Sequence, residues 1–369
     1  MTYTKPIKFN KNPITSSRSL RKFGRNVFFS LGVPVVFSII AVVLSRIAED
    51  TLFDTGDTMG TLNLFMDFIK TMVTTLVAAL ALNSNLNSGR MDFSLGATGI
   101  LGALLASLVV PSIDSLQHMF LFIVLTIIFA MILGFLHSLI FIFLKLPPIV
   151  TSLGMCLVYE GIAKVIAGNN NTIIIKTVVS FSNFFKEPII IIPILLIVML
   201  VMSFAFCYTK FGYNKNALVY DQKISVDTGI NEVKNCIVCF CLAGALIGLF
   251  TVLDIAGMQN ITIKTDLGSS STVFRNFLPI FIGGILAKYN NQIVGLTLAV
   301  FSTTILTTGM DTCSAIGLDG NMVSLINGLM VFAVLVYMVD KNRFINWVKM
   351  QRYLAKERYL NPKGMGGKK

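Results

Sequence analysis

Apolar runs of about 20 residues recur along the chain and alternate with short polar segments. A helix of that length crosses the roughly 30 Å hydrocarbon core of a bilayer, whereas a β-barrel shows short segments of alternating polarity. The pattern predicts an all-α integral membrane protein, a polytopic bundle of about ten transmembrane helices with broken or re-entrant segments. The predicted spans are 27–47, 62–82, 96–110, 119–144, a span beginning at 147, 188–207, 236–253, the short run 277–287, 294–308 and 323–339.

A polar segment from Asn83 to Gly96 interrupts the pattern after the second span. Polar or irregular backbone at membrane depth is tolerated only where protein buries it or where it lines a cavity. We therefore expect this segment to line a translocation pathway, and an ordinary cytoplasmic hairpin is the alternative. Glycines recur every third residue at its end, which predicts a smooth helix face for close packing. The candidate pathway residues here are Asn83, Asn85, Asp92, Ser94 and Gly96.

A second interruption is the pair Pro147-Pro148, which cannot continue the preceding helix and suits the first turn of the next one. Thr151 and Ser152 place hydroxyls in that turn, where they cap the helix or face a polar path; capping is the favoured interpretation. Thr151, Ser152 and Gly154 are nevertheless included among the pathway candidates. The run 277–287 is too short for an upright crossing and predicts a half-helix or re-entrant passage.

Charged residues within the predicted spans are few, and they occur as close pairs. Asp67 and Lys70 are three residues apart, and Glu160 and Lys164 are four apart, so each pair shares a helix face. Because isolated charges are costly in lipid, we expect mutual neutralisation in both pairs, with a proton relay as the alternative. His137 is expected to hydrogen-bond a neighbouring helix.

The composition supports this class and orients the chain. Hydrophobic residues make up 54% and charged residues 13% of 369, and the net charge is +12. Basic residues gather in segments 1–26 and 341–369, which predicts cytoplasmic termini anchored at membrane lipid, without nucleic-acid binding. The first apolar run is longer than a signal-peptide core, so it is expected to remain as a span. The membrane domain is then 27–340.

The polar segment from Tyr208 to Asn235 carries several lysines and acids. We expect a cytoplasmic loop at 209–234 that forms one or two short helices, one of them ended by Gly229. A compact element of mixed charge in the largest internal loop is suited to docking another protein.

Sequence signatures of enzymes are absent. The chain has no phosphate-binding Gly-x-x-x-x-Gly-Lys-Ser/Thr, no His-Glu-x-x-His and no Gly-x-Ser-x-Gly, and its six cysteines predict small buried hydrophobes. We expect no catalysis, no cofactor and no metal. Uphill transport would then draw on an ion gradient or a partner, and the docking loop favours a partner.

Four segments together carry a resemblance. Residues 92–96 read Asp-Phe-Ser-Leu-Gly, 146–155 read Leu-Pro-Pro-Ile-Val-Thr-Ser-Leu-Gly-Met, and 282–284 read Ile-Gly-Gly. Gly212, Ala217, Gly229 and Ile230 match the spacing of a Gly-Arg-x-x-x-Ala … Gly-Ile segment. In this order the segments resemble the ribose/galactose-type permeases of bacterial ABC importers, a family with relatives for branched-chain amino acids and nucleosides. The chain departs from that pattern at Val219-Tyr220, Glu160 and Lys288 to Asn291.

The resemblance implies a permease subunit in a bacterial plasma membrane that forms the path for a sugar. It implies three partners: an ABC ATPase subunit, an extracytoplasmic solute-binding protein, and a second permease subunit, either a copy or a paralogue. An ion-coupled transporter or channel acting through Asp67, Glu160 or His137 is the alternative, and a membrane scaffold is a third. The resemblance assigns ATPase coupling to Gly212, Ala217, Ser225, Gly229, Ile230 and Lys234.

Overall fold

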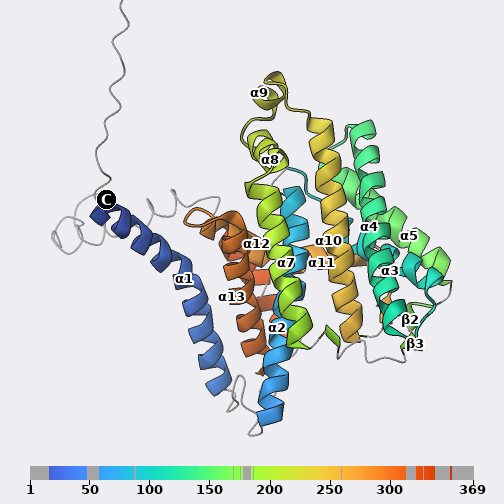
Figure 1. The fold of residues 1–369 in the computed structure, drawn as a ribbon, viewed down its shortest axis with the longest axis horizontal. Coiled ribbons are helices and arrows are strands. Elements are labelled where there is room, and N and C mark those ends of the chain that lie inside the picture. Colours follow the sequence, from blue (N-terminus) through green and yellow to red (C-terminus); the bar gives the residue numbers. More distant parts are fainter. Residues whose placement is uncertain are drawn as a thin grey trace, which may run out of the picture.

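The computed structural model is a helical bundle, and it describes residues 16–47, 58–86, 89–168, 170–174, 176–177, 184–185, 187–258, 260–312, 321–326, 328–336 and 350 (Figure 1). Within these residues, seven helices are long and apolar enough to cross a membrane. This confirms the predicted polytopic all-α membrane fold. The seven are α1 (Ser16–Ile47), α2 (Thr58–Leu86), α4 (Leu116–Leu144), α5 (Pro148–Ala167), α7 (Pro188–Cys207), α10 (Glu232–Met258) and α13 (Gln292–Thr312).

Shorter elements connect the long helices. They are α3 (Leu95–Val109), α8 (Lys210–Tyr220), α9 (Gln222–Asp227), η1 (Gly268–Ser270), α11 (Ser271–Arg275) and α12 (Phe277–Leu286). Residues 321–326 and 328–336 are also helical. Two small sheets lie at the end of the bundle opposite α8 and α9: β1 (Ser112–Ile113) pairs in parallel with β3 (Lys176–Thr177), and β2 (Thr172–Ile174) pairs antiparallel with β4 (Asn260–Thr262).

Two predicted boundaries are wrong because helices continue past the apolar runs. Helix α2 ends at Leu86, so Asn83 and Asn85 lie on its last turns rather than in the break. Helix α10 ends at Met258 rather than at the predicted residue 253, so Asp254 is helical. Asn83 and Asn85 are buried and Asp254 is half-buried, and the backbone stays hydrogen-bonded within each helix. The short run at 277–287 is a ten-residue helix, as predicted.

The expected terminal segments fall largely outside the described residues. Only residues 16–26 of the basic segment 1–26 are described, as the beginning of α1, and only Met350 of the tail 341–369. The cytoplasmic placement of both ends stays a prediction.

Glycines bring the central helices into close contact. A Cβ added to Gly244 of α10 would lie closer than 3.0 Å to the Ala130 backbone of α4, and one added to Gly134 of α4 would meet the Phe240 carbonyl of α10. On α3, Gly99 packs against Thr251 of α10. The predicted smooth face of α3 is therefore confirmed, since only residues without a side chain allow this backbone approach.

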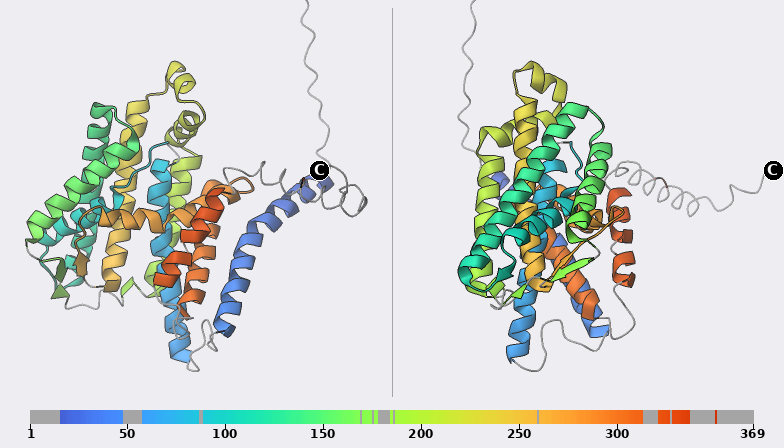
Figure 2. Two further views of the ribbon diagram at one scale, coloured as in Figure 1. Left: turned by 180° about the vertical axis from the view of Figure 1, so that it is seen from behind. Right: turned by 90° about the vertical axis from the view of Figure 1, so that its right-hand side faces the viewer.

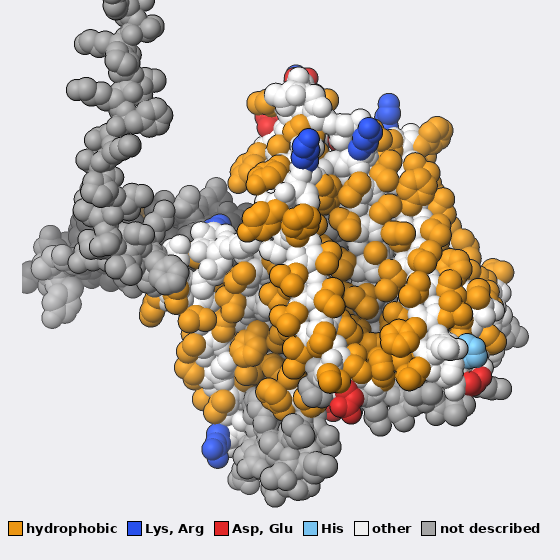
Figure 3. All heavy atoms as spheres, viewed as in Figure 1, with side chains coloured by type: hydrophobic (Ala, Val, Ile, Leu, Met, Phe, Trp, Pro, Cys, Tyr) orange, Lys and Arg blue, Asp and Glu red, His pale blue; other side chains and the backbone are white. Residues whose placement is uncertain are grey.

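The surface separates a broad apolar band from a polar end. Apolar side chains cover the outer faces of α4, α7 and α10, and lysines and arginines lie around α8 and α9 (Figure 3). Exposed apolar residues also follow α1 and α5. A large exposed apolar surface on long helices is the surface that a bilayer covers.

Candidate functional site

Two interruptions in the helical pattern meet in the middle of the bundle. One is residues 89–94, between α2 and α3, and the other runs from β4 to α12 through η1 and α11, which lie across the bundle (Figure 2). The Phe93 ring lies 5.4 Å from that of Phe274 and 6.3 Å from that of Phe277, centroid to centroid. A Cβ on Gly96 would lie closer than 3.0 Å to the Ser269 carbonyl oxygen. The first turn of α3 therefore rests directly on the backbone of η1.

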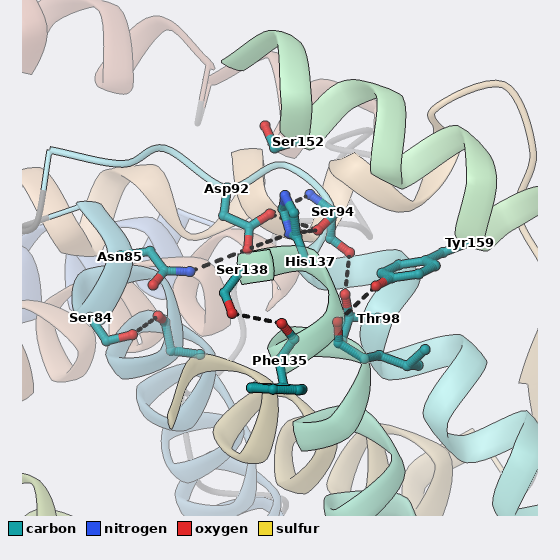
Figure 4. Close-up of polar contacts among 12 residues, drawn as sticks. Ser84, Asn85, Asp92, Ser94, Thr98, Phe135, His137, Ser138, Ser152 and Tyr159 are labelled. Carbon is teal, nitrogen blue, oxygen red and sulfur yellow. Dashed lines mark hydrogen bonds and ion pairs between the residues drawn. The ribbon is translucent and has the colours of Figure 1, made fainter. Parts of the chain in front are cut away.

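Asp92 is the centre of a buried polar cluster at the first break (Figure 4). Its Oδ1 accepts hydrogen bonds from the backbone N–H of Ser94 at 2.9 Å and from the Ser94 hydroxyl at 2.7 Å. Its Oδ2 accepts from Asn85 Nδ2 at 3.2 Å. An aspartate that binds the N–H two residues later forms an Asx turn, which fixes the break just ahead of α3.

His137 of α4 completes this cluster. Its Nδ1 lies 3.0 Å from the Ser94 hydroxyl oxygen and 3.5 Å from Asp92 Oδ2. The ring also packs edge-on against Phe240 of α10, with centroids 4.8 Å apart. His137 was predicted to bond a neighbouring helix; it instead bonds the break, at Ser94, the residue that precedes α3. The four polar side chains join α2, the break just before α3, and α4 in an interior where every unmade hydrogen bond is costly.

Glu160 of α5 holds the second break. Its Oε1 accepts from the Ser269 N–H at 2.7 Å and from the Ser269 hydroxyl, and its Oε2 accepts from the Leu267 N–H at 2.9 Å. Asp266 and Leu267 have φ values of 58° and 63°, in the left-handed region that side chains other than glycine disfavour. The buried carboxylate therefore stabilises a turn whose backbone is unfavourable by itself.

The predicted ion pair between Glu160 and Lys164 is wrong. Lys164 Nζ donates to the side-chain oxygen of Asn171, while the carboxylate is fully engaged with the turn at 267–269. Backbone and hydroxyl donors fixed in the interior already satisfy the Glu160 carboxylate, so it does not need the Lys164 ammonium as a partner. For Asp67 and Lys70, the expected neutralisation stays a prediction.

The remaining pathway candidates lie apart from the Asp92 cluster. The Thr151 hydroxyl donates to the Pro147 carbonyl at 3.4 Å and that of Ser152 to the Ile149 carbonyl at 3.0 Å. Neither caps α5, so the favoured interpretation is wrong; Pro148 does occupy the first turn, as predicted. Figure 4 shows Ser152 near the cluster but not bonded to it. Gly154 is exposed, and Asn83 accepts from Gln292 of α13 at 3.5 Å.

A groove of about 560 Å³ runs beside α5 at the second break. The sequence interpretation did not identify it, although Glu160 and Lys164 flanking Gly161 on one helix are an unusual combination in a membrane span. Glu160 belongs both to this groove and to the turn that it holds. The lining residues are Leu157, Glu160, Gly161, Lys164, Val165, Gly168, Thr265 and Asp266.

Helices α8 and α9 project from one end of the bundle as a compact unit (Figure 1). Thr209 caps α8 by accepting from the Gly212 N–H at 3.3 Å, and Asp221 caps α9 by accepting from the Ile224 N–H at 3.0 Å. Gly229, at φ 92°, ends α9 as predicted. Its N–H donates to the Val226 carbonyl at 2.9 Å, a hydrogen bond that is typical of a helix ending in glycine.

Comparison with known proteins decides the family. A family model described as the permease component of branched-chain amino acid transport systems matches residues 64–336. The match begins in α2 and includes both breaks, α5 and the α8–α9 unit. The chain belongs to this permease family. The resemblance of the short motifs to ABC importer permeases is thereby confirmed. No curated protein and no solved structure gives a significant match.

The permease places its predicted coupling residues in different environments. Gly212 and Ser225 are buried, Ala217 and Ile230 are half-buried, and Gly229 and Lys234 are exposed. Gly212 packs against the Phe206 backbone at the end of α7, where a Cβ would not fit. Gly212 and Gly229 therefore shape the α8–α9 unit, and other side chains form its surface.

The outward surface of the α8–α9 unit is apolar in part. Tyr213, Val219, Tyr220 and Ile224 are exposed, and Tyr220 is 91% exposed. The sequence interpretation missed them because it weighed the charges of this segment. Large apolar residues in this otherwise polar segment could have indicated an interaction surface. Exposed clusters of apolar side chains mark such surfaces.

Lys215 is buried beneath α8, and it carries a prediction on pH. Its Nζ lies 3.7 Å from the centroid of the Phe206 ring and has no hydrogen-bond partner among the described residues. Burial lowers the pKa of Lys215 from 10.5 to about 8. The unfolded chain then binds more protons between those values, so stability increases with pH across this window.

We expect the thermal stability of the purified permease to rise between about pH 8 and pH 10.5, by on the order of 2–3 kcal/mol from this group. Lys215→Met should raise the stability at pH 7 and flatten that rise, because the apolar side chain carries no charge to desolvate. Thermal unfolding in detergent measures both effects, with exposed Lys223→Met as the control. An unchanged pH dependence in Lys215→Met would show that other groups cause it.

Proposed function

We propose that the protein is the permease subunit of a bacterial ABC importer, which forms the membrane path for a sugar delivered by a solute-binding protein. The observation that carries this proposal is the α8–α9 unit. It is a capped pair of helices beyond the apolar band, with exposed tyrosines and an isoleucine on its surface. Such a surface is suited to a partner protein, and the chain has no nucleotide-binding motif of its own.

In this proposal the α8–α9 unit faces the cytoplasm of a bacterial plasma membrane and docks the separate ATPase subunit. Both termini then lie on the cytoplasmic side. The opposite end, with its two small sheets and the groove beside α5, receives the binding protein. A second permease subunit, a copy or a paralogue, covers the open side of the groove and completes the path.

The proposed path uses the two helix breaks. The candidates Asn83, Asn85, Asp92, Ser94, Gly96, Thr151 and Ser152 are buried in the described state, and Gly154 is exposed on α5. We assign them to the gate: movement of α8–α9 separates the breaks and exposes their hydrogen-bonding groups to solute. Hydroxyl and amide groups suit a sugar, which offers donors and acceptors without charge.

The decisive test is co-purification of the tagged chain with associated polypeptides, followed by ATP-driven uptake in proteoliposomes. We expect the wild type to retain an ATPase subunit and to take up a sugar. Tyr220→Asp combined with Ile224→Asp should lose both, because charge disrupts an apolar contact, and Tyr220→Phe should keep both. Ion-driven uptake by the chain alone would contradict the proposal, and uptake of branched-chain amino acids instead would contradict the sugar assignment.

A further inference from the structure

Arg90 lies at the beginning of the first break and is buried. Its backbone N–H donates to the Asn85 carbonyl at 3.1 Å, so its position is fixed relative to the last turn of α2. Its guanidinium carbon lies 6.0 Å from the centroid of the Phe141 ring of α4, a cation–π arrangement. Arg90 is therefore anchored to the same two helices that supply Asn85 and His137 to the Asp92 cluster.

The guanidinium of Arg90 bonds a residue at the beginning of α10, next to the α8–α9 unit. Arg90 Nη2 donates to Glu232 Oε1 at 2.9 Å, and Glu232 is in the first turn of α10. The same oxygen accepts from Gln222 Nε2 of α9 at 2.6 Å. One carboxylate oxygen thus joins α9, α10 and the beginning of the break, across 142 residues of sequence.

The contacts form one continuous chain of polar bonds. It runs from Gln222 through Glu232 to Arg90, then through the Asn85 backbone and side chain to Asp92. Within this chain, Arg90 and Glu232 form an ion pair that joins α10 to the beginning of the break. The side chain of Arg90 is 7% exposed and that of Glu232 is 33% exposed, so the guanidinium end of the pair is shielded from water and loses its main partner when the bond breaks.

We propose that Arg90 is the positioning residue through which the α8–α9 unit acts on the Asp92 cluster. This rests on the proposed function, because it assigns to α8–α9 the docking of an ATPase. Movement of α9 shifts Glu232, the ion pair carries Arg90 with it, and Arg90 moves the break that Asp92 and Ser94 hold in place. Severing the pair leaves the ATPase bound but uncouples ATP hydrolysis from transport.

The test measures solute transported per ATP hydrolysed by the reconstituted complex of permease, ATPase and binding protein. Arg90→Glu and Glu232→Arg are each expected to lower this ratio about tenfold, because a single reversal leaves two like charges facing each other in a partly buried site. The double reversal restores the pair and should return the ratio to within about threefold of the wild type. Lys288→Glu is the control, since Lys288 is exposed and has no ion pair among the described residues.

Glu232→Gln is a milder variant, which tests the inference if a charge reversal prevents the protein from folding. It keeps the shape and the acceptor for Gln222 but removes the charge, so it should lower the ratio while the ATPase still co-purifies. The inference is overturned if this variant keeps the wild-type ratio, if hydrolysis and transport fall in proportion, or if the double reversal restores nothing. A wild-type complex without ATP-driven transport would overturn the proposed function and this inference together. If the wild type couples transport to ATP hydrolysis and the variants keep the same ratio, this inference alone is overturned.

Discussion

Asp92→Ala is expected to abolish transport and to destabilise the protein by about 3–5 kcal/mol. The carboxylate accepts from the Ser94 N–H, the Ser94 hydroxyl and the Asn85 amide, and it faces the His137 ring. Alanine leaves these donors without an acceptor in an interior that water does not reach. Thermal unfolding in detergent measures the loss of stability, and ATP-driven uptake in proteoliposomes measures the loss of function.

Two matched variants make this prediction specific. Asp114→Ala removes an exposed carboxylate that, among the described residues, accepts from the Ser112 hydroxyl alone, so it should change stability by less than about 0.5 kcal/mol. Asp92→Asn should have an intermediate effect, because it keeps one acceptor for Ser94 and turns a donor toward the Asn85 amide. If Asp92→Ala unfolded at the temperature of the wild type, the cluster would not hold the break.

Gly96→Ala is expected to lower stability by about 3 kcal/mol, the upper end of overpacking costs. An added methyl would lie closer than 3.0 Å to the Ser269 carbonyl, and 3.3 Å from the Thr272 hydroxyl oxygen. The near obstacle is backbone, so α3 and η1 must separate, and the Glu160 turn is displaced with them. We expect uptake to fall, with thermal unfolding and uptake assays as the measurements.

The sign of the effect is itself diagnostic. Within a helix, glycine to alanine is otherwise favourable by about 1 kcal/mol. Gly284 on α12 has nothing within 4 Å of an added Cβ, so Gly284→Ala should be neutral or stabilising. A stabilising Gly96→Ala would mean that the two breaks are not in contact.

Features that depend on local sequence could be predicted. The apolar runs predicted the spans, the short run at 277–287 predicted a short helix, and Gly229 predicted the end of α9. The glycine repeat of α3 gave its packing face but not its neighbours. Each of these follows from residues within about one or two turns, where chain geometry already fixes which groups are close.

Features that depend on distant segments could not be predicted. The spacing of Glu160 and Lys164 predicted an ion pair, but the carboxylate bonds a turn 107 residues away. Asp92 and Ser94 were singled out as polar residues at a break, yet nothing in the sequence indicated that His137 would join them. The ion pair between Arg90 and Glu232 was not predicted, because 142 residues separate the two in the sequence.

The sequence by itself determined that this permease is a multi-pass helical membrane protein with interrupted helices. The bilayer imposes that result, because it requires apolar runs of fixed length and a fully hydrogen-bonded backbone. Only the tertiary structure decided which polar side chains meet at the interruptions. A buried polar group bonds whichever donor or acceptor the packed fold brings within about 3 Å, and sequence spacing does not constrain that choice.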